Sequence, residues 1–106
     1  MNINKHAKDL ASYIRSTKEF KEMNNAKTDL DKNRSIKKKL DNYISQKNNI
    51  YSNYKLEEAS IKMNRLNQEY NDFFNLPIVS NYMTATKTFN SMMEDIYKTI
   101  EKELLK

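Results

Sequence analysis

The residues that could perform chemistry are few and are poorly spaced for it. His6 is the only histidine, and the chain has neither cysteine nor glycine. A catalytic histidine needs an orienting acid and a reacting partner, and a metal-binding histidine needs further ligands. The residues at helical spacing from His6 do not supply the full set, and Ile3 stands where the Glu-x-x-His motif of di-iron bundles needs glutamate. We therefore expect no catalytic residue, no metal and no cofactor.

Two pairs of adjacent acids, Glu57-Glu58 and Glu94-Asp95, are the next candidates. Neighbouring residues of a helix point about 100° apart, so neither pair makes a two-carboxylate site by itself. A glycine-rich phosphate loop is excluded because the chain has no glycine. Disulfides and thiolate ligands are excluded because it has no cysteine. The prediction is that the protein is not an enzyme.

A run of basic residues is the best signal for an anionic partner. This basic cluster consists of Arg34, Lys37, Lys38 and Lys39. Arg34, Lys37 and Lys38 would share one face of a helix and could contact the phosphates of a nucleic acid. However, Asp31 and Asp41 flank the cluster, and no aromatic platform or recognition-helix motif accompanies it. A solvated helix face is the preferred interpretation, and a nucleic-acid-binding module is the alternative.

The charge of the chain is distributed unevenly. Its net charge is +5, but residues 1–55 hold 13 basic and 6 acidic side chains, whereas residues 56–106 hold 6 basic and 8 acidic ones. This asymmetry fits an anionic partner for the first half. It fits equally a fold in which antiparallel segments from the two halves complement each other, and we prefer that interpretation because the basic charge is scattered.

The composition indicates the fold class. Of the 106 residues, 38% are hydrophobic and 31% charged, and a single proline and the absence of glycine leave little for the tight turns of a β-sheet. We expect one all-α domain over residues 1–106, built from amphipathic helices. No apolar run is long enough to span a membrane, and the first ten residues lack the apolar core of a signal peptide. The expected location is therefore the cytoplasm.

Apolar residues recur at steps of three and four along five stretches, the second of which continues through Phe20, Met23, Ala26 and Leu30. The first runs from Asn4 to about Arg15, and a capping box at Ser16–Glu19 marks either a new helix or a bend. Asp31 is the expected N-cap of a segment from Lys32 to about Ser52. A turn over residues 52–55 then leads to a helix over residues 56–74.

The last stretch, Asn75 to Lys106, should be one long helix, with Asn75 as its cap and Pro77 in its first turn. Such a helix would be roughly 40–45 Å long, whereas a compact globule of this chain would span only about 33 Å. We therefore predict an elongated antiparallel helical bundle. The near-heptad spacing predicts coiled-coil-like packing at shallow angles. The residues expected in the core or in a subunit seam are Tyr82, Phe89, Met93, Ile96 and Ile100.

Three groups of residues, in this order, carry a resemblance to a known family. The first is Ala7-x-x-Leu10-x-x-x-Ile14-x-Ser16-x-x-x-Phe20, and the second is Leu30-Asp31 followed by Ile36 and Leu40. The third is Leu76-Pro77-Ile78-Val79-x-x-Tyr82-x-x-Ala85, followed by Phe89, Ile96 and Ile100. With these residues the chain resembles the YlbF/YmcA family over nearly its whole length, and its lack of cysteine makes the YheA-like branch the nearer match.

The resemblance implies an all-helical, self-associating protein of low-GC Gram-positive bacteria without enzymatic activity. Better-understood members act in regulatory complexes that influence competence, sporulation and biofilm formation, and they work with a membrane-bound endoribonuclease in RNA processing. Some members bind iron–sulfur clusters through cysteines, and this chain has none, so no cluster ligand can be transferred to it. We expect a cytoplasmic homodimer that serves as an interaction or regulatory subunit with regulatory protein partners.

Overall fold

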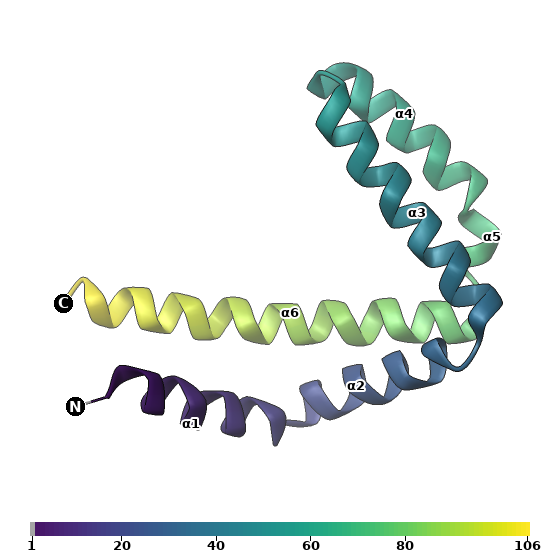
Figure 1. Cartoon of the computed structure of the whole chain (residues 1–106). Helices are drawn as coiled ribbons and strands as arrows, with labels where there is room; N and C mark the ends of the chain where they lie inside the picture. Colours follow the sequence, from purple (N-terminus) through teal and green to yellow (C-terminus); the bar gives the residue numbers. More distant parts are fainter. Residues whose placement is uncertain (1) are drawn as a thin grey trace. The chain divides into compact units, whose positions relative to one another are not determined.

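The computed structural model describes residues 2–106, and within them the chain forms six α-helices and no strand (Figure 1). The prediction of an all-α fold is confirmed. The helices group into two compact units. Unit 1 holds the residues up to Thr28 together with Asn81–Lys106, and unit 2 holds Asp29–Ser80.

The first two helices are α1 (Ile3–Arg15) and α2 (Lys18–Asp31). The side chain of Asn2 caps α1 by accepting a hydrogen bond from the Asn4 amide at 2.9 Å. Between the helices, the Thr17 hydroxyl accepts from the Phe20 amide at 3.2 Å. The predicted capping sequence therefore starts a new helix, with Thr17 as the residue that caps it.

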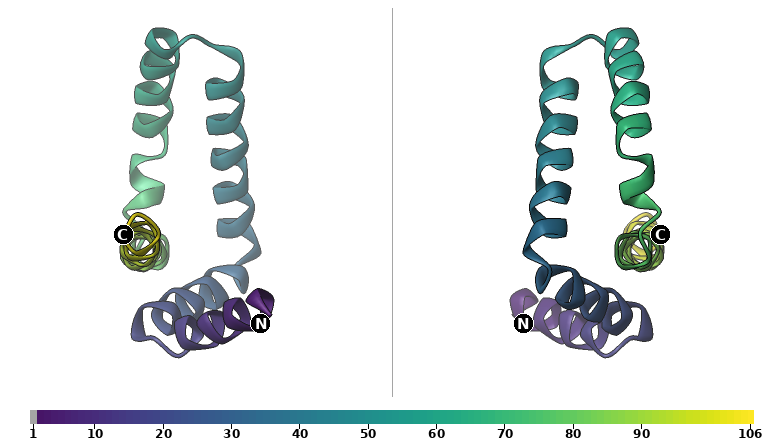
Figure 2. Two further views of the ribbon diagram at one scale, coloured as in Figure 1. Left: turned by 90° about the vertical axis from the view of Figure 1, so that its left-hand side faces the viewer. Right: turned by 90° about the vertical axis from the view of Figure 1, so that its right-hand side faces the viewer.

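Unit 2 is a helical hairpin in which α3 (Arg34–Asn53) and α4 (Leu56–Glu69) run antiparallel and are followed by the short α5 (Asn71–Phe74) (Figure 2). The turn between α3 and α4 consists of Tyr54 and Lys55, within the predicted residues 52–55.

The start of α3 differs from the prediction. Asp31 is the last residue of α2, and the cap of α3 is Asn33, whose side-chain oxygen accepts from the Ile36 amide at 3.2 Å. The helix boundary lies two residues later because α2 continues through Asp31, and Asn33 is the residue that caps α3.

The hydrophobic core of unit 2 is well closed. It includes Leu30, Leu40, Ala59, Met63, Leu66, Tyr70, Phe73 and Val79, each at most 9% exposed. Full burial of one large apolar side chain contributes roughly 1.5–3 kcal/mol to stability. The 3-4 spacing of the α4 residues in this set is the reason that one face of α4 is covered along its length.

The last helix, α6 (Pro77–Leu104), has 28 residues and is therefore about 42 Å long. The prediction of one long C-terminal helix with Pro77 in its first turn is confirmed. The prediction that Asn75 caps it is wrong: Asn75 ends α5, and the Leu76 carbonyl accepts the hydrogen bond from the Ser80 amide at 2.8 Å. The single turn of α5 takes up the residues just before the proline.

In unit 1, α1 and α2 run antiparallel to α6 (Figure 1). The Phe20 ring, just after the bend between α1 and α2, meets the Phe89 ring edge to face, with 5.9 Å between their centroids. No residue of α1 is buried. The interior of unit 1, which includes Ala26 of α2 at 3% exposed, is therefore smaller than that of unit 2.

Candidate functional site

The structure places the candidate catalytic residues on exposed helix surfaces. His6 lies on α1 and is exposed, as are Glu94 and Asp95 on α6. Glu57 and Glu58 lie in the first turn of α4, where negative charge stabilises the free amide end of the helix. Within residues 2–106 no three histidine, cysteine or acidic side chains come close enough to hold a metal ion. The acid pair of α4 thus has a structural explanation.

The basic cluster starts α3, and its four side chains are exposed but do not act together. Lys37 lies 3.9 Å from Asp41, one turn further along the same helix. The Lys39 ammonium lies over the rings of Tyr70 and Phe73, 5.5 and 5.4 Å from their centroids. This cation–π contact directs Lys39 to the aromatic core of the hairpin. Arg34 and Lys38, one turn apart, remain as the pair best placed to meet an anion.

An aromatic and polar network between α3 and α4 was not predicted from the sequence. The Tyr43 hydroxyl donates a hydrogen bond of 2.7 Å to the Asn67 side-chain oxygen, and the Gln46 amide donates one of 3.2 Å to the Tyr70 hydroxyl. The Tyr43 ring also packs 5.2 Å from that of Tyr70. The sequence offered one signal for this network, namely the tyrosines Tyr43 and Tyr70 at apolar positions of their helices. A buried tyrosine usually finds a hydrogen-bond partner for its hydroxyl.

Burial raises the pKa of the Tyr43 hydroxyl above its ordinary value, and the nearby Tyr51 raises it further. The physical reason is that a phenolate loses hydration at this partly covered position and would be repelled by a second phenolate. The neutral hydroxyl is the form that donates to Asn67. The network therefore has a defined protonation state at neutral pH.

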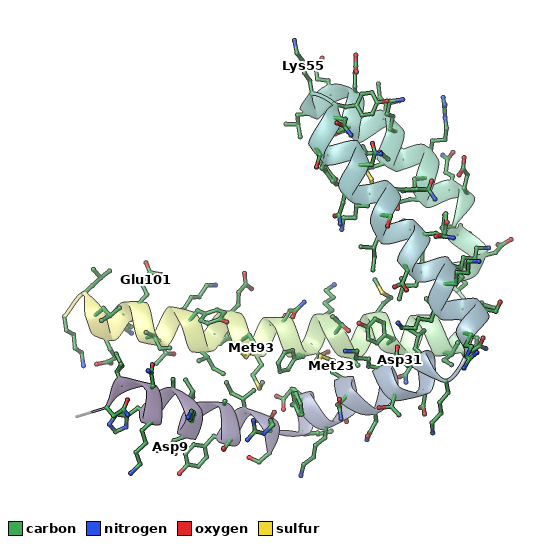
Figure 3. The ribbon with its side chains drawn as sticks, viewed as in Figure 1. Asp9, Met23, Asp31, Lys55, Met93 and Glu101 are labelled. Atoms are coloured by element: carbon green, nitrogen blue, oxygen red, sulfur yellow. The ribbon has the colours of Figure 1, made fainter. Side chains whose placement is uncertain are left out.

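The predicted seam residues of α6 differ in how far their side chains are buried. Tyr82, Phe89, Met93 and Ile96 are half-buried, and Ile100 is 44% exposed. Figure 3 shows Met93 of α6 and Met23 of α2 pointing into the space between these two helices. The structure thus puts Met93 and Phe89 on the side of α6 that faces α2, since Phe89 meets the Phe20 ring there. Toward the end of the helix the same stripe becomes uncovered.

We define the distal stripe as Met93, Ile96, Ile100 and Leu104. Leu104 is 78% exposed although it continues the spacing of three and four. On α1, Ile3 is 79% and Leu10 39% exposed. Apolar residues aligned on a helix face but left in water are typical of a surface that binds another protein.

No helix within residues 2–106 combines the length and the apolar character that crossing a membrane requires. A comparison with protein families finds that the model described as control of competence regulator ComK, YlbF/YmcA, matches residues 3–104. No match was found among curated proteins or among solved structures.

Proposed function

The chain belongs to the YlbF/YmcA family, and from this membership and the open apolar face of unit 1 we propose that it is a non-enzymatic regulatory protein that works by binding other proteins. Its first partner in this proposal is a second copy of itself. The description of its family names the control of the competence regulator ComK. We further propose that it is a cytoplasmic protein of the cysteine-free YheA-like branch, from a Gram-positive bacterium, and that residues 1–106 work as one module.

The observation that carries self-association is the distal stripe. Its members keep the near-heptad spacing that lets one helix pack against another of the same kind. Ile100 is 44% and Leu104 78% exposed, and covering this surface against a second copy contributes roughly 2–4 kcal/mol per copy, because each large apolar side chain contributes roughly 1.5–3 kcal/mol when fully covered. Part of this gain offsets the loss of translational and rotational freedom on association.

Charge favours α6 over α3 as the surface that meets a second copy. Between Pro77 and Leu104, three lysines stand against four carboxylates, so α6 carries a net charge of −1. Between Arg34 and Asn53, five basic residues stand against one aspartate, so α3 carries +4. Two copies of α3 would repel each other, whereas two copies of α6 approach with almost no net repulsion. The seam residues Tyr82 and Phe89 then support the fold of unit 1, and the distal stripe forms the interface.

Sedimentation velocity of the full chain over a wide range of concentrations tests this proposal. We expect a dimer at micromolar concentration that dissociates on dilution. A monomer at every concentration, with its helices intact by circular dichroism, would overturn the self-association.

Nucleic-acid binding is the second candidate, and the exposed pair Arg34 and Lys38 supports it. Binding through phosphate contacts would weaken steeply with salt. Titration of a labelled RNA at two salt concentrations, with Lys38→Glu as the variant, separates the two functions. Affinity that is steeply salt-dependent and lost in the variant would favour RNA, and affinity capture with and without nuclease would show whether RNA bridges the partners.

A further inference from the structure

Near the turn of unit 2, residues of α3 and α4 line an open surface groove with a volume of about 270 Å³. Its floor is apolar and includes Ile50 and Leu66, of which Leu66 is 4% exposed and belongs to the core. The groove is thus built on the closed part of the hairpin. It lies outside the distal stripe and does not include the basic cluster.

Two cations line this groove from the same face of α4. Lys62 and Arg65 are three residues apart, and within residues 2–106 neither has a carboxylate within 4 Å of its charged nitrogens. The Lys62 ammonium lies 4.4 Å from the centroid of the Tyr54 ring, which also lines the groove. Glu69 is the one acid among the lining residues, so the groove has a net charge of +1.

A third donor comes from α3. The side-chain oxygen of Asn49 accepts a hydrogen bond of 2.8 Å from the Asn53 amide, which also donates to the Asn49 backbone carbonyl at 3.0 Å. Within residues 2–106 the side-chain N–H groups of Asn49 donate no hydrogen bond, so they can donate to a ligand. Asn49 lines the groove, as do the two cations. Amide, ammonium and guanidinium donors are the set that recognises an oxyanion.

We infer that this groove binds a peptide segment of a partner protein through one carboxylate next to an apolar side chain. A net charge of +1 suits a single carboxylate and is too low for a polyphosphate, while Ile50 and Leu66 accept the neighbouring apolar group. The inference deepens the proposed function, since it rests on the proposal that the chain acts through protein partners. It does not depend on self-association, which involves residues of unit 1.

The experiment titrates the full chain, labelled with ¹⁵N, with two capped pentapeptides, Ala-Leu-Glu-Leu-Ala and its glutamine counterpart. We expect the glutamate peptide to shift the signals of Asn49 and Arg65 and to bind about fivefold more tightly, as a partly exposed ion pair allows. Arg65→Gln should abolish this preference. Lys47→Gln, which removes an exposed charge of α3 that does not line the groove, should preserve it.

Equal affinity for the two peptides, or no binding at millimolar peptide, would overturn the inference. A parallel titration with oligouridylate tests RNA as the ligand of the groove. If the RNA binds more tightly than the glutamate peptide, and if Arg65→Gln abolishes that RNA binding, the inference is overturned. Sedimentation of the same samples keeps the two proposals distinct. A dimer that ignores both peptides refutes the groove alone, and a monomer that prefers the glutamate peptide refutes self-association alone.

Discussion

Ile100 provides the most direct test of the distal stripe, because its side chain is 44% exposed in one copy of the chain. Full burial of an isoleucine contributes roughly 1.5–3 kcal/mol, so covering the exposed part contributes roughly 0.7–1.3 kcal/mol per copy. In a two-fold symmetric dimer the substitution acts twice. Since about 1.4 kcal/mol is a tenfold change in affinity, Ile100→Ala should raise the dissociation constant of the dimer roughly tenfold to eightyfold.

Ile61 supplies a matched control for this measurement. It is an isoleucine inside α4 of unit 2, is 64% exposed and lies outside the distal stripe. Sedimentation velocity over a dilution series should show a weakened dimer for Ile100→Ala and an unchanged one for Ile61→Ala, with equal helicity by circular dichroism. Equal dissociation constants for the unsubstituted protein, Ile100→Ala and Ile61→Ala would refute the assignment of the interface to the distal stripe. Equal weakening of the dimer by the two substitutions would also refute it.

Three further predictions follow from named contacts. Asn33→Ala should cost about 1 kcal/mol of stability because it removes the cap of α3, whereas Asp31→Ala should cost much less; equal melting temperatures of the two variants would contradict the revised helix boundary. Phe89→Asp should unfold unit 1 or dissociate the dimer because it puts a carboxylate against the Phe20 ring, and unchanged mass and melting would disprove this. The raised pKa of Tyr43 contributes stability that is present below the ordinary tyrosine pKa of about 10 and is lost as pH rises through the folded-state value. Urea unfolding from pH 8 upward should therefore show a loss above about pH 10 that is smaller in Tyr43→Phe.

The helices could be predicted because their spacing of three and four is interrupted at few places. Pro77 fixed the start of α6, and the residues between Asn53 and Leu56 fixed the turn of the hairpin. The start of α3 could not be fixed in this way, because Asp31 and Asn33 are both good caps and stand two residues apart. In the structure Asp31 stays inside α2 and the Asn33 side chain caps α3.

The depth of burial along α6 could not be predicted from its periodicity. Val79 and Leu104 belong to the same stripe, yet Val79 is fully buried and Leu104 is 78% exposed. Spacing defines which face of a helix is apolar, but the element opposite determines whether that face is covered. The groove of unit 2 was missed for a related reason. Asn49 and Arg65 come from different helices, and only the pairing of α3 with α4 makes them neighbours of one cavity.

Different kinds of contact stabilise the interior of each unit. This difference bears on how each unit binds a partner. In unit 2, hydrogen bonds from Tyr43 to Asn67 and from Gln46 to Tyr70 join α3 to α4. Such bonds have narrow geometric limits, so they fix one register of the hairpin and hold the groove in shape. In unit 1 the contact between Phe20 and Phe89 is apolar, and apolar surfaces tolerate small shifts without leaving polar groups unpaired. We therefore expect the surface of unit 1 to adjust to the helix it meets, and the groove of unit 2 to select its ligand by charge.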